Sequence, residues 1–473
     1  MALIPIYLAI NSYKARSGIL SSERLVNMYS EYTPPEAPFR AALYGTPGLK
    51  LWLDFGTFSP IYGIEKMGDN IYVVTGLTVY KINSSGAQTV IGNMAVTPGR
   101  VMMTNNGSQV TILVESGQAF YCTDIAGSLA EITDNDYNPS GSVTTMDGFT
   151  IFTKLESNEY QISNLDVTQT YDALDNDFVL STSSNLVRVE SNNLEVWFFK
   201  EDVTLVYYNS GNGTFPFERK NGVLIQKGCA AKYSVATLDN NFYFLGDDRV
   251  IYQTHGYQLK QISTFPISEE IESYSKVDDA FSFTYTQAGH KFYSITFPAA
   301  NKTWVYDITT DAWHERESLD SNLQPKEWRA NAHVFFAGKN LVGDNAAGKI
   351  YELDLDTYTE DGTTLISKVI SATQFDNYNR DAVEDLTLVM DTGVGINDGQ
   401  GSEPEIMLRT STDGAKTWSN ELKQPLGKQG SYEAEVVWNR VAFGRSLILE
   451  LKISDPVKRS IISSFLGVTG GQN

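Results

Sequence analysis

Short runs of alternating apolar and polar residues follow one another along this chain, and turn-forming residues separate them. The segment DNIYVVTGLTVYKINSSGAQTVIG, residues 69–92, contains two or three such runs with tight turns between them. An alternation with a period of two places the apolar side chains on one face of a β-strand. No long stretch repeats apolar residues at helical spacing. The pattern therefore predicts an all-β protein.

Six further segments have the same form as residues 69–92. They are residues 108–133, 147–166, 192–219, 239–263, 289–318 and 331–357. The segments start about 20–50 residues apart, a spacing that is typical of propellers and solenoids. A single small sheet cannot bury both faces, so such units stack on one another around a ring. The repeats predict a β-propeller of six or seven blades over residues 56–360.

Two regions lie outside the repeats. Residues 1–55 are rich in Pro and Gly turns, and residues 361–473 contain alternating strands such as SLILELKIS, residues 446–454. Because chain ends often lie close together, we expect both regions to form one β-sandwich-like second domain. The apolar run at the N-terminus is interrupted by Pro5 and lacks a cleavage site, so it predicts a strand or an arm and not a signal peptide.

The hairpin NKTWVYDITTDAWHERES, residues 301–318, places Trp304 and Trp313 on successive strands. The DITTD turn between them is too short to form a pocket wall. Aromatic pairs of this kind stabilise sheets, and large aromatic side chains dominate protein cores. We expect both tryptophans to pack within or between blades, and not to surround a sugar site.

Composition excludes several classes of function. The 473-residue chain is 42% apolar and 20% charged, with a formal net charge of −21. Binding to the phosphate backbone needs clustered Lys and Arg, and the sequence has no such cluster. The two cysteines, Cys122 and Cys229, have no metal-binding spacing, so we expect buried free thiols. No segment reaches the roughly 18 apolar residues of a membrane span.

Motifs that would indicate an enzyme are absent from the sequence. There is no phosphate-binding or dinucleotide-binding glycine loop, no GxSxG element and no histidine spacing that suits zinc. We therefore expect no cofactor, no metal and no catalytic residue. The abundant carboxylates leave open an Asp/Glu pair for glycoside hydrolysis.

One short motif, STDGAKTW at residues 411–418, resembles the Asp-box hairpin of sialidases and related propellers. Ser411, Asp413, Thr417 and Trp418 match that pattern, whereas Gly414 comes one place early and Ala415 occupies the position where Gly is usual. In the Asp-box, the Asp side chain bonds turn amides and Gly supplies a positive φ. The motif is a folding element, so we expect a structural turn and no enzymatic role.

Both ends of the chain resemble the tail hub, or nozzle, proteins of short-tailed phages, which are also called packaged-DNA stabilisation proteins. The resemblance rests on LVNMYSEYTPPEAPFRAALYGTPGLKLW (25–52) and WNRVAFGRSLILELKISDPVK (438–458). The matching residues are Val26, Asn27, Met28, Thr46, Pro47 and Gly48 near the N-terminus, and Trp438, Arg440, Gly444, Arg445, Asp455 and Pro456 near the C-terminus.

The resemblance implies a structural role in the tail of a virion that is assembled in the host cytoplasm. Members form a ring, usually of six copies, beneath the portal and the adaptor, or head-to-tail connector. The ring extends and closes the DNA exit channel and retains the packaged genome. A tail needle plugs the channel, and fibres or spikes attach around the ring. Genomic DNA would pass through the lumen without sequence-specific binding.

Two other functions remain open on the sequence. One is a propeller glycosidase, such as a sialidase-like depolymerase, and the other is a carbohydrate-binding propeller. A net charge of −21 suits the wall of a DNA conduit, because an acidic lumen repels phosphates, but an ordinary acidic surface accounts for it equally well. The mass of the native particle separates these functions, since only the tail hub requires a large closed ring.

Overall fold

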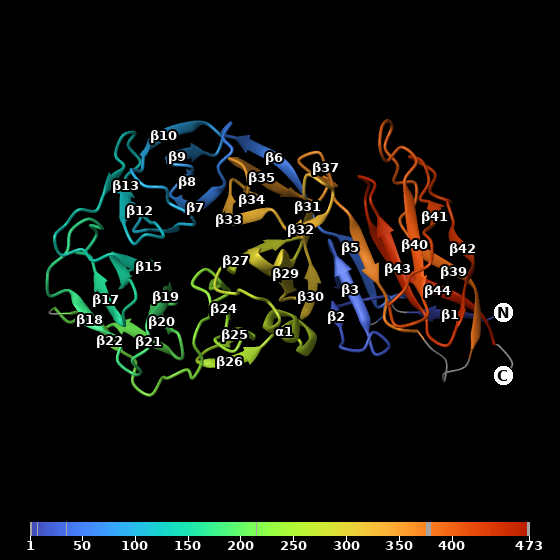
Figure 1. Ribbon diagram of the computed structural model, residues 1–473. Coiled ribbons are helices and arrows are strands. Elements are labelled where there is room, and N and C mark those ends of the chain that lie inside the picture. The colour runs from blue at the N-terminus through green and yellow to red at the C-terminus, as the bar shows by residue number, and fades with distance from the viewer. Residues whose placement is uncertain (1, 7, 35, 214, 375–379, 471–473) are drawn as a thin grey trace.

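The computed structural model describes residues 2–6, 8–34, 36–213, 215–374 and 380–470. Figure 1 shows a ring of small sheets beside a separate stack of longer strands. Within the described residues, seven antiparallel sheets of four strands succeed one another around the ring, which makes it a seven-bladed β-propeller. The prediction of an all-β protein with a propeller and a second β-rich domain is confirmed, and the blade number is seven.

The first five blades are each formed by four consecutive strands. The first blade contains β7 (Ile61–Met67), β8 (Asn70–Thr75), β9 (Thr78–Asn83) and β10 (Gln88–Asn93), and the second contains β11 (Met102–Asn105), β12 (Val110–Leu113), β13 (Ala119–Cys122) and β14 (Ala130–Glu131). The third contains β15 (Ser140–Met146), β16 (Phe149–Lys154), β17 (Glu159–Ile162) and β18 (Asn176–Phe178), and the fourth contains β19 (Leu186–Asn192), β20 (Glu195–Lys200), β21 (Thr204–Asn209) and β22 (Phe217–Arg219). The fifth contains β23 (Ala236–Leu238), β24 (Asn241–Leu245), β25 (Ile251–His255) and β26 (Gln258–Gln261).

The last two blades involve the N-terminal part of the chain. The sixth blade is β27 (Phe281–Gln287), β28 (His290–Phe297), β29 (Lys302–Asp307) and β30 (Ala312–Glu315). The seventh is β33 (Ala330–Phe336), β34 (Lys339–Asp344), β35 (Lys349–Asp354) and, as its fourth strand, β6 (Gly48–Asp54). Because β6 precedes the first blade in the chain and pairs antiparallel with β35, it closes the ring.

The blades pack on one another through their second strands. In β8, β12, β16, β20, β24, β28 and β34 nearly every residue is buried, because a neighbouring blade covers each face. Each hydrophobic cluster of the propeller is shared by two adjacent blades. Trp304 and Trp313 belong to the cluster between the fifth and sixth blades, are 3% and 1% exposed, and meet edge to face at 6.5 Å. The expectation of packed tryptophans is confirmed.

The second domain is a sandwich of two sheets. One sheet has the order β3 (Ser22–Val26), β38 (Ser367–Ile370), β43 (Ile448–Ile453), β40 (Glu405–Ser411) and β41 (Leu422–Pro425). The other has the order β4 (Met28–Tyr32), β5 (Ala41–Gly45), β44 (Ser460–Gly470), β39 (Asp381–Met390) and β42 (Val436–Gly444), with β1 (Ala2–Ile6) also paired to β44. Their inner faces enclose one apolar core that includes Leu25, Met28, Leu386, Trp438 and Leu451.

Residues 1–55, which the sequence assigned to the second domain, contribute to both domains. Strands β1, β4 and β5 pair within the sandwich, whereas β6 lies in the propeller. Strand β3 joins the two, because it pairs antiparallel with β38 and forms a parallel bridge to β30 of the sixth blade. The sixth blade and one sheet of the sandwich are therefore a single hydrogen-bonded sheet of ten strands.

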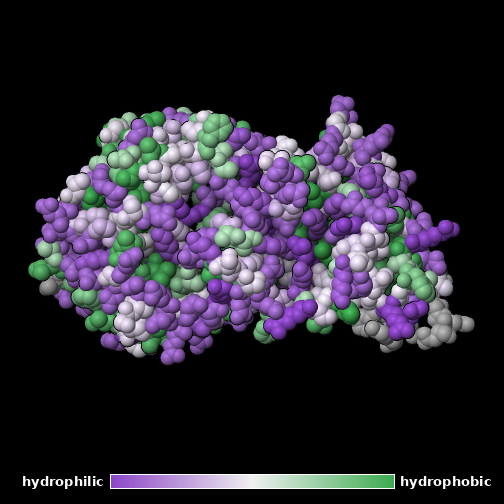
Figure 2. All heavy atoms as spheres, in the orientation of Figure 1, coloured by the Kyte–Doolittle hydropathy of each residue, from purple (hydrophilic) through white to green (hydrophobic). Residues whose placement is uncertain are grey.

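The remaining elements are short. They are β2 (Tyr13–Lys14), α1 (Phe265–Glu272), the 3₁₀ turn η1 (Pro298–Ala300), β31 (Glu317–Leu319), β32 (Pro325–Glu327), β36 (Thr359–Glu360) and β37 (Thr363–Thr364). No helix among the described residues has the length and apolar character needed to cross a membrane. Figure 2 shows a mostly hydrophilic surface on which hydrophobic residues form small separate groups. Cys122 and Cys229 are buried free thiols, as expected.

Candidate functional site at the domain junction

Asn27 lies at the centre of the junction between the propeller and the sandwich. It connects β3 to β4 with a φ of 53°, a left-handed conformation that Asn tolerates better than most residues. Its side chain donates hydrogen bonds to the carbonyl oxygens of Glu317 and Ile366, both at 2.8 Å, and accepts one from the Glu317 amide. Its own carbonyl accepts from the Thr46 amide and the Ser367 hydroxyl. One buried residue thus joins four segments of the chain.

The residues next to Asn27 pack into two different hydrophobic cores, that of the sandwich and that of the propeller. Val26 forms the parallel bridge to Glu315 in the sixth blade. Met28 packs into the sandwich core, whereas Tyr29 packs into the cluster between the sixth and seventh blades. Successive side chains of a strand point to opposite faces, so this short stretch supplies apolar groups to both domains. The Val-Asn-Met motif is therefore the point where the domains meet.

The Thr-Pro-Gly turn, residues 46–48, lies beside Asn27. The Pro47 carbonyl accepts a hydrogen bond from Arg316, and the Gly48 amide donates to the carbonyl of Thr357 at 2.9 Å. A Cβ atom on Gly48 would lie 2.3 Å from that carbonyl oxygen, which is closer than any real contact. Only glycine fits at this position, because the backbone of the segment that leads to the sandwich crosses directly over it.

A buried ion network supports the junction from the propeller side. Arg24 on β3 donates to both carboxylate oxygens of Glu315 on β30, at 2.7 and 2.6 Å. Lys302 on β29 donates to the same carboxylate at 2.8 Å. Burial alone would raise the pKa of Glu315, but the charges and hydrogen bonds of Arg24 and Lys302 outweigh it and lower that pKa to about 2. The carboxylate is therefore charged throughout the physiological range.

Two further arginines are buried near the junction. Arg316 is fully buried, and its guanidinium stacks on the ring of Trp328 at 3.9 Å. Arg459, at the start of β44, donates to the carbonyls of Leu365 and Tyr358 in the segment between the domains, at 2.7 and 3.2 Å. Burial lowers the pKa of both groups, that of Arg459 to about 10. Both guanidinium groups donate to backbone carbonyls in the segments that connect the two domains.

The C-terminal motif is dispersed over the sandwich and does not join the N-terminal one. Trp438 is buried in the core and donates to the Leu422 carbonyl, while Arg440 is exposed with a φ of 57°. Gly444 and Arg445 line a small groove beside β1, and Pro456 packs against Gly401. Asp455 comes closest to the junction, because its carbonyl accepts from Arg459 and its carboxylate from the Glu405 amide.

The Asp-box-like turn lies in the sandwich after β40. One carboxylate oxygen of Asp413 accepts from the Lys416 and Thr417 amides at 3.0 Å, and the other accepts from the Thr417 hydroxyl at 2.6 Å. These bonds hold the Asp413 pKa well below its ordinary value. Gly414 and Ala415 both have positive φ, 78° and 63°, so Ala415 adopts the conformation that Gly usually supplies. Trp418 is half-buried, with Arg409 over its ring at 5.6 Å.

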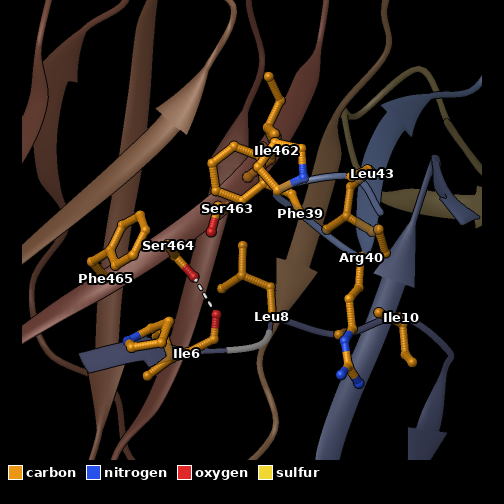
Figure 3. A pocket seen from close by; sticks show the side chains of 16 residues that line it. Ile6, Leu8, Ile10, Phe39, Arg40, Leu43, Ile462, Ser463, Ser464 and Phe465 are labelled. Atoms are coloured by element: carbon orange, nitrogen blue, oxygen red, sulfur yellow. Dashed lines mark hydrogen bonds between the residues drawn. The ribbon is translucent and has the colours of Figure 1, made fainter. Parts of the chain in front are cut away.

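An apolar groove lies on the sandwich, where β1 and β5 diverge along β44. In Figure 3, Leu8 lies between Leu43 and Phe465, and Ile6 lies on the same side as Phe465. Its volume is about 400 Å³, and Arg40 is the charged residue in its lining. It contains no pair of carboxylates, so it has no arrangement for glycoside hydrolysis.

A second cavity lies on the propeller axis. The first strands of several blades line a chamber of about 200 Å³, and a vestibule of about 600 Å³ adjoins it. Arg100 and Tyr233 line both spaces. The Tyr233 hydroxyl donates to the Arg100 carbonyl at 2.7 Å, and burial raises its pKa to about 12. This hydroxyl is therefore no activated nucleophile of the kind a sialidase would need. Within the described part of the chain, no cluster of His, Cys, Asp and Glu could hold a metal ion.

The N-terminal motif lies at the junction, but the sequence analysis predicted no junction and did not single out the residues that stabilise it electrostatically. Arg24, Glu315, Arg316 and Arg459 occupy ordinary strand and turn positions, and charged residues there are usually exposed. The one available signal was the run HERES at residues 314–318, in which five polar residues continue from the end of a strand.

A propeller and a sandwich that share one hydrogen-bonded sheet and a buried junction define a protein of two fused β-domains. Comparison with known families is consistent with this class. The profile described as "Bacteriophage P22 Gp10, beta-propeller" matches residues 8–358, and the one described as "Bacteriophage P22 Gp10, beta-sandwich" matches residues 368–468. The chain belongs to the bacteriophage P22 Gp10 family of phage stabilisation proteins, which are structural components of the virion.

Other comparisons give weaker similarities. No curated protein matches the sequence. The WD40 β-propeller domain of Doa1 is 9% identical with a TM-score of 0.41, covering 65% of this chain and 96% of that chain. The computationally designed protein Ika8 is 9% identical with a TM-score of 0.39, covering 65% and 100%. YCF48 from Cyanidioschyzon merolae is 10% identical with a TM-score of 0.42, covering 65% and 98%. Likeness at this level says nothing about function.

Proposed function

We propose that this chain is a non-enzymatic tail hub, or nozzle, subunit of a short-tailed phage. Six copies form a closed ring beneath the portal and the adaptor. The ring extends and closes the DNA exit channel, retains the packaged genome, and anchors the tail needle and the fibres or spikes. Membership of the P22 Gp10 family supports this proposal at the level of the family.

The observation that supports it best in this chain is the junction between the domains. A subunit of a pressurised conduit has to transmit force without bending between its domains. Here β3 bonds to both β30 and β38, so the two domains are continuous through backbone hydrogen bonds. The bidentate pair of Arg24 and Glu315 fixes β3 to the blade at the same place. An interface of this kind resists hinge motion, in contrast to a flexible linker.

The surface charge fits a wall along which DNA slides. A net charge of −21 per chain would give a ring of six copies a strongly negative field, which repels phosphate groups. We propose that the exposed tip of the 393–405 loop and the 32–40 segment contact neighbouring subunits. Residues 396–400 of the loop are exposed, and Ile396 among them is 39% exposed.

Native mass spectrometry tests this function directly. The purified chain is measured alone and with the adaptor protein of the same phage. We expect a closed oligomer, of six copies with the adaptor present. Monomer alone under both conditions would count decisively against the hub.

A pair of matched variants tests the contact surface. Ile396→Asp introduces a charge at the proposed contact and should reduce ring formation. Leu174→Asp introduces the same charge at a leucine that is 84% exposed on the propeller and should assemble normally. Equal assembly of the two variants would exclude the 393–405 loop as a subunit contact.

A further inference from the structure

Two guanidinium groups line the chamber on the propeller axis, those of Arg100 and Arg188. The chamber is enclosed by the first strands β7, β11, β19, β27 and β33, and its lining contains no carboxylate. This is unexpected in a chain with 57 acidic and 36 basic residues. A cation-lined chamber at the centre of an acidic protein requires a physical reason.

Arg100 is a half-buried cation that forms no ion pair within the described residues, although the Glu115 carboxylate attracts it from a longer distance. Its guanidinium donates to the carbonyl and the side-chain oxygen of Asn331 and stacks on the ring of Phe281 at 3.7 Å. Among the described residues, no carboxylate lies within ion-pair distance of it. Burial lowers its pKa to about 10, so the group is still charged at neutral pH. The stacking holds the guanidinium plane fixed beside the chamber.

The charges around the chamber do not cancel. Arg188 is neutralised by Glu190, which accepts from its Nε atom at 3.1 Å. Lys232, at the vestibule side, has its ammonium group 4.9 Å from the Tyr233 ring and forms no ion pair in the part of the chain described. Burial lowers the pKa of Lys232, the Glu115 carboxylate opposes that shift, and the charge of Arg188 adds to it. The three cations Arg100, Arg188 and Lys232 thus lie near two carboxylates, Glu190 and Glu115. A partly buried charge that is incompletely compensated is costly, and a counter-ion from solution reduces that cost.

Carboxylates near the chamber set limits on what can enter. Five acidic residues line the vestibule outside it, together with Arg100, Lys232 and Lys276. They are Glu115, Glu156, Glu201, Asp278 and Asp279. Glu65, on β7, has its pKa raised to about 7 by burial, so it is mostly neutral below that pH. A chamber of about 200 Å³ is smaller than the roughly 300–1,000 Å³ of pockets for drug-sized ligands. The ligand must therefore be small and weakly charged.

We propose that the axial chamber binds a small oxyanion, a carboxylate or a phosphate group, held by Arg100 beside the Arg188–Glu190 ion pair. Guanidinium groups match the geometry of both anions and bind them through paired hydrogen bonds. The bound anion would neutralise Arg100 and link the first strands of blades on different sides of the ring. This inference concerns the interior of one subunit and is independent of ring assembly.

Thermal unfolding in the presence of anions tests the proposal. The wild-type protein is titrated with inorganic phosphate and, separately, with acetate, at about pH 6 and constant ionic strength, where Glu65 is mostly protonated. We expect a saturable rise in melting temperature with at least one of the two anions, which also identifies the preferred oxyanion. Arg100→Gln should weaken the response about tenfold or more, because it removes the charged hydrogen-bond donor.

Lys66→Gln is the matched control, since it removes one positive charge from an exposed position on β7 and should respond like the wild type. A response that is linear and equal in all three proteins would overturn the proposal. A second measurement covers the case in which Arg100→Gln fails to fold. Wild-type crystals soaked in selenate should show an anomalous peak beside Arg100, and an empty chamber together with no saturable response would exclude the site.

Discussion

Replacing Glu315 by Gln should destabilise the whole protein, because this one carboxylate holds two cations at the junction. Glu315 is 1% exposed and accepts from Arg24 twice and from Lys302 once. Lowering a carboxyl pKa from its ordinary value of 4.5 to about 2 corresponds to about 3 kcal/mol of preference for the charged form. Removing one partner of a buried ion pair typically costs about 3–5 kcal/mol. We therefore expect Glu315→Gln to lower the free energy of unfolding by about 3–5 kcal/mol at neutral pH.

The pH dependence of this effect has a definite sign. The folded-state pKa of Glu315 lies below the unfolded value, so its contribution is fully present above about pH 4.5. It is lost as the pH falls through about 2, where the carboxyl is protonated in both states. The difference between wild type and Glu315→Gln should therefore be constant from pH 5 to 8 and shrink at lower pH.

Urea unfolding followed by tryptophan fluorescence measures both quantities. Glu352→Gln is the matched control, because Glu352 pairs with Lys339 at the surface of the seventh blade. Exposed pairs contribute about 0–1 kcal/mol, so this variant should unfold almost like the wild type. If Glu315→Gln loses no more stability than Glu352→Gln, or loses it equally at all pH values, the ion network does not stabilise the junction.

Three other predictions follow from the described contacts. Trp304→Ala should cost about 3–5 kcal/mol in urea unfolding and lower the yield of folded subunit, because the ring is buried between blades; a soluble variant that had lost only oligosaccharide binding would contradict this. Asp413→Ala should lower the melting temperature more than Asp398→Ala, because only Asp413 accepts turn hydrogen bonds; equal melting temperatures would refute it. Glu65→Gln should be up to about 3 kcal/mol more stable than wild type at pH 8 but not at pH 4, because the raised pKa makes the wild type lose stability as pH rises through about 7; a pH-independent difference would exclude this.

The repeat pattern located the blades but not all of their strands. For the first six blades the recognisable segments contain the second and third strands and, except in the third blade, the fourth strand. The second strands are the strongly apolar ones. Most first strands, such as SGSVTTM at residues 140–146, face the axis and carry small or polar residues, so their periodicity is weak. In the seventh blade the fourth strand, GLKLWLD at residues 48–54, comes from the other end of the chain. Alternation within a strand indicates which face is buried, but it gives no information about a distant partner.

The junction illustrates the same limit for individual residues. In the sequence, Asn27 was notable only as part of the Val-Asn-Met motif. An Asn between two strands usually indicates an exposed turn, so its burial could not be predicted. Its burial depends on the carbonyls of residues 317 and 366, which lie almost 300 residues or more away in the sequence. The role of Glu315 likewise depends on Arg24, from the opposite end of the propeller sequence. Long-range polar pairing of this kind leaves no local pattern, whereas strand alternation does.

The junction also accounts for the order of segments along the chain. Strand β3 precedes the propeller and β38 follows it, and the two pair antiparallel. The propeller is therefore inserted between two adjacent strands of the sandwich. Because β3 also bridges to β30, the insertion is fixed at its base and cannot rotate freely on its two connections. Neither domain can complete its sheets without the N-terminal segment, since β6 closes the propeller while β4 and β5 complete the sandwich. Folding of one domain is thereby coupled to folding of the other.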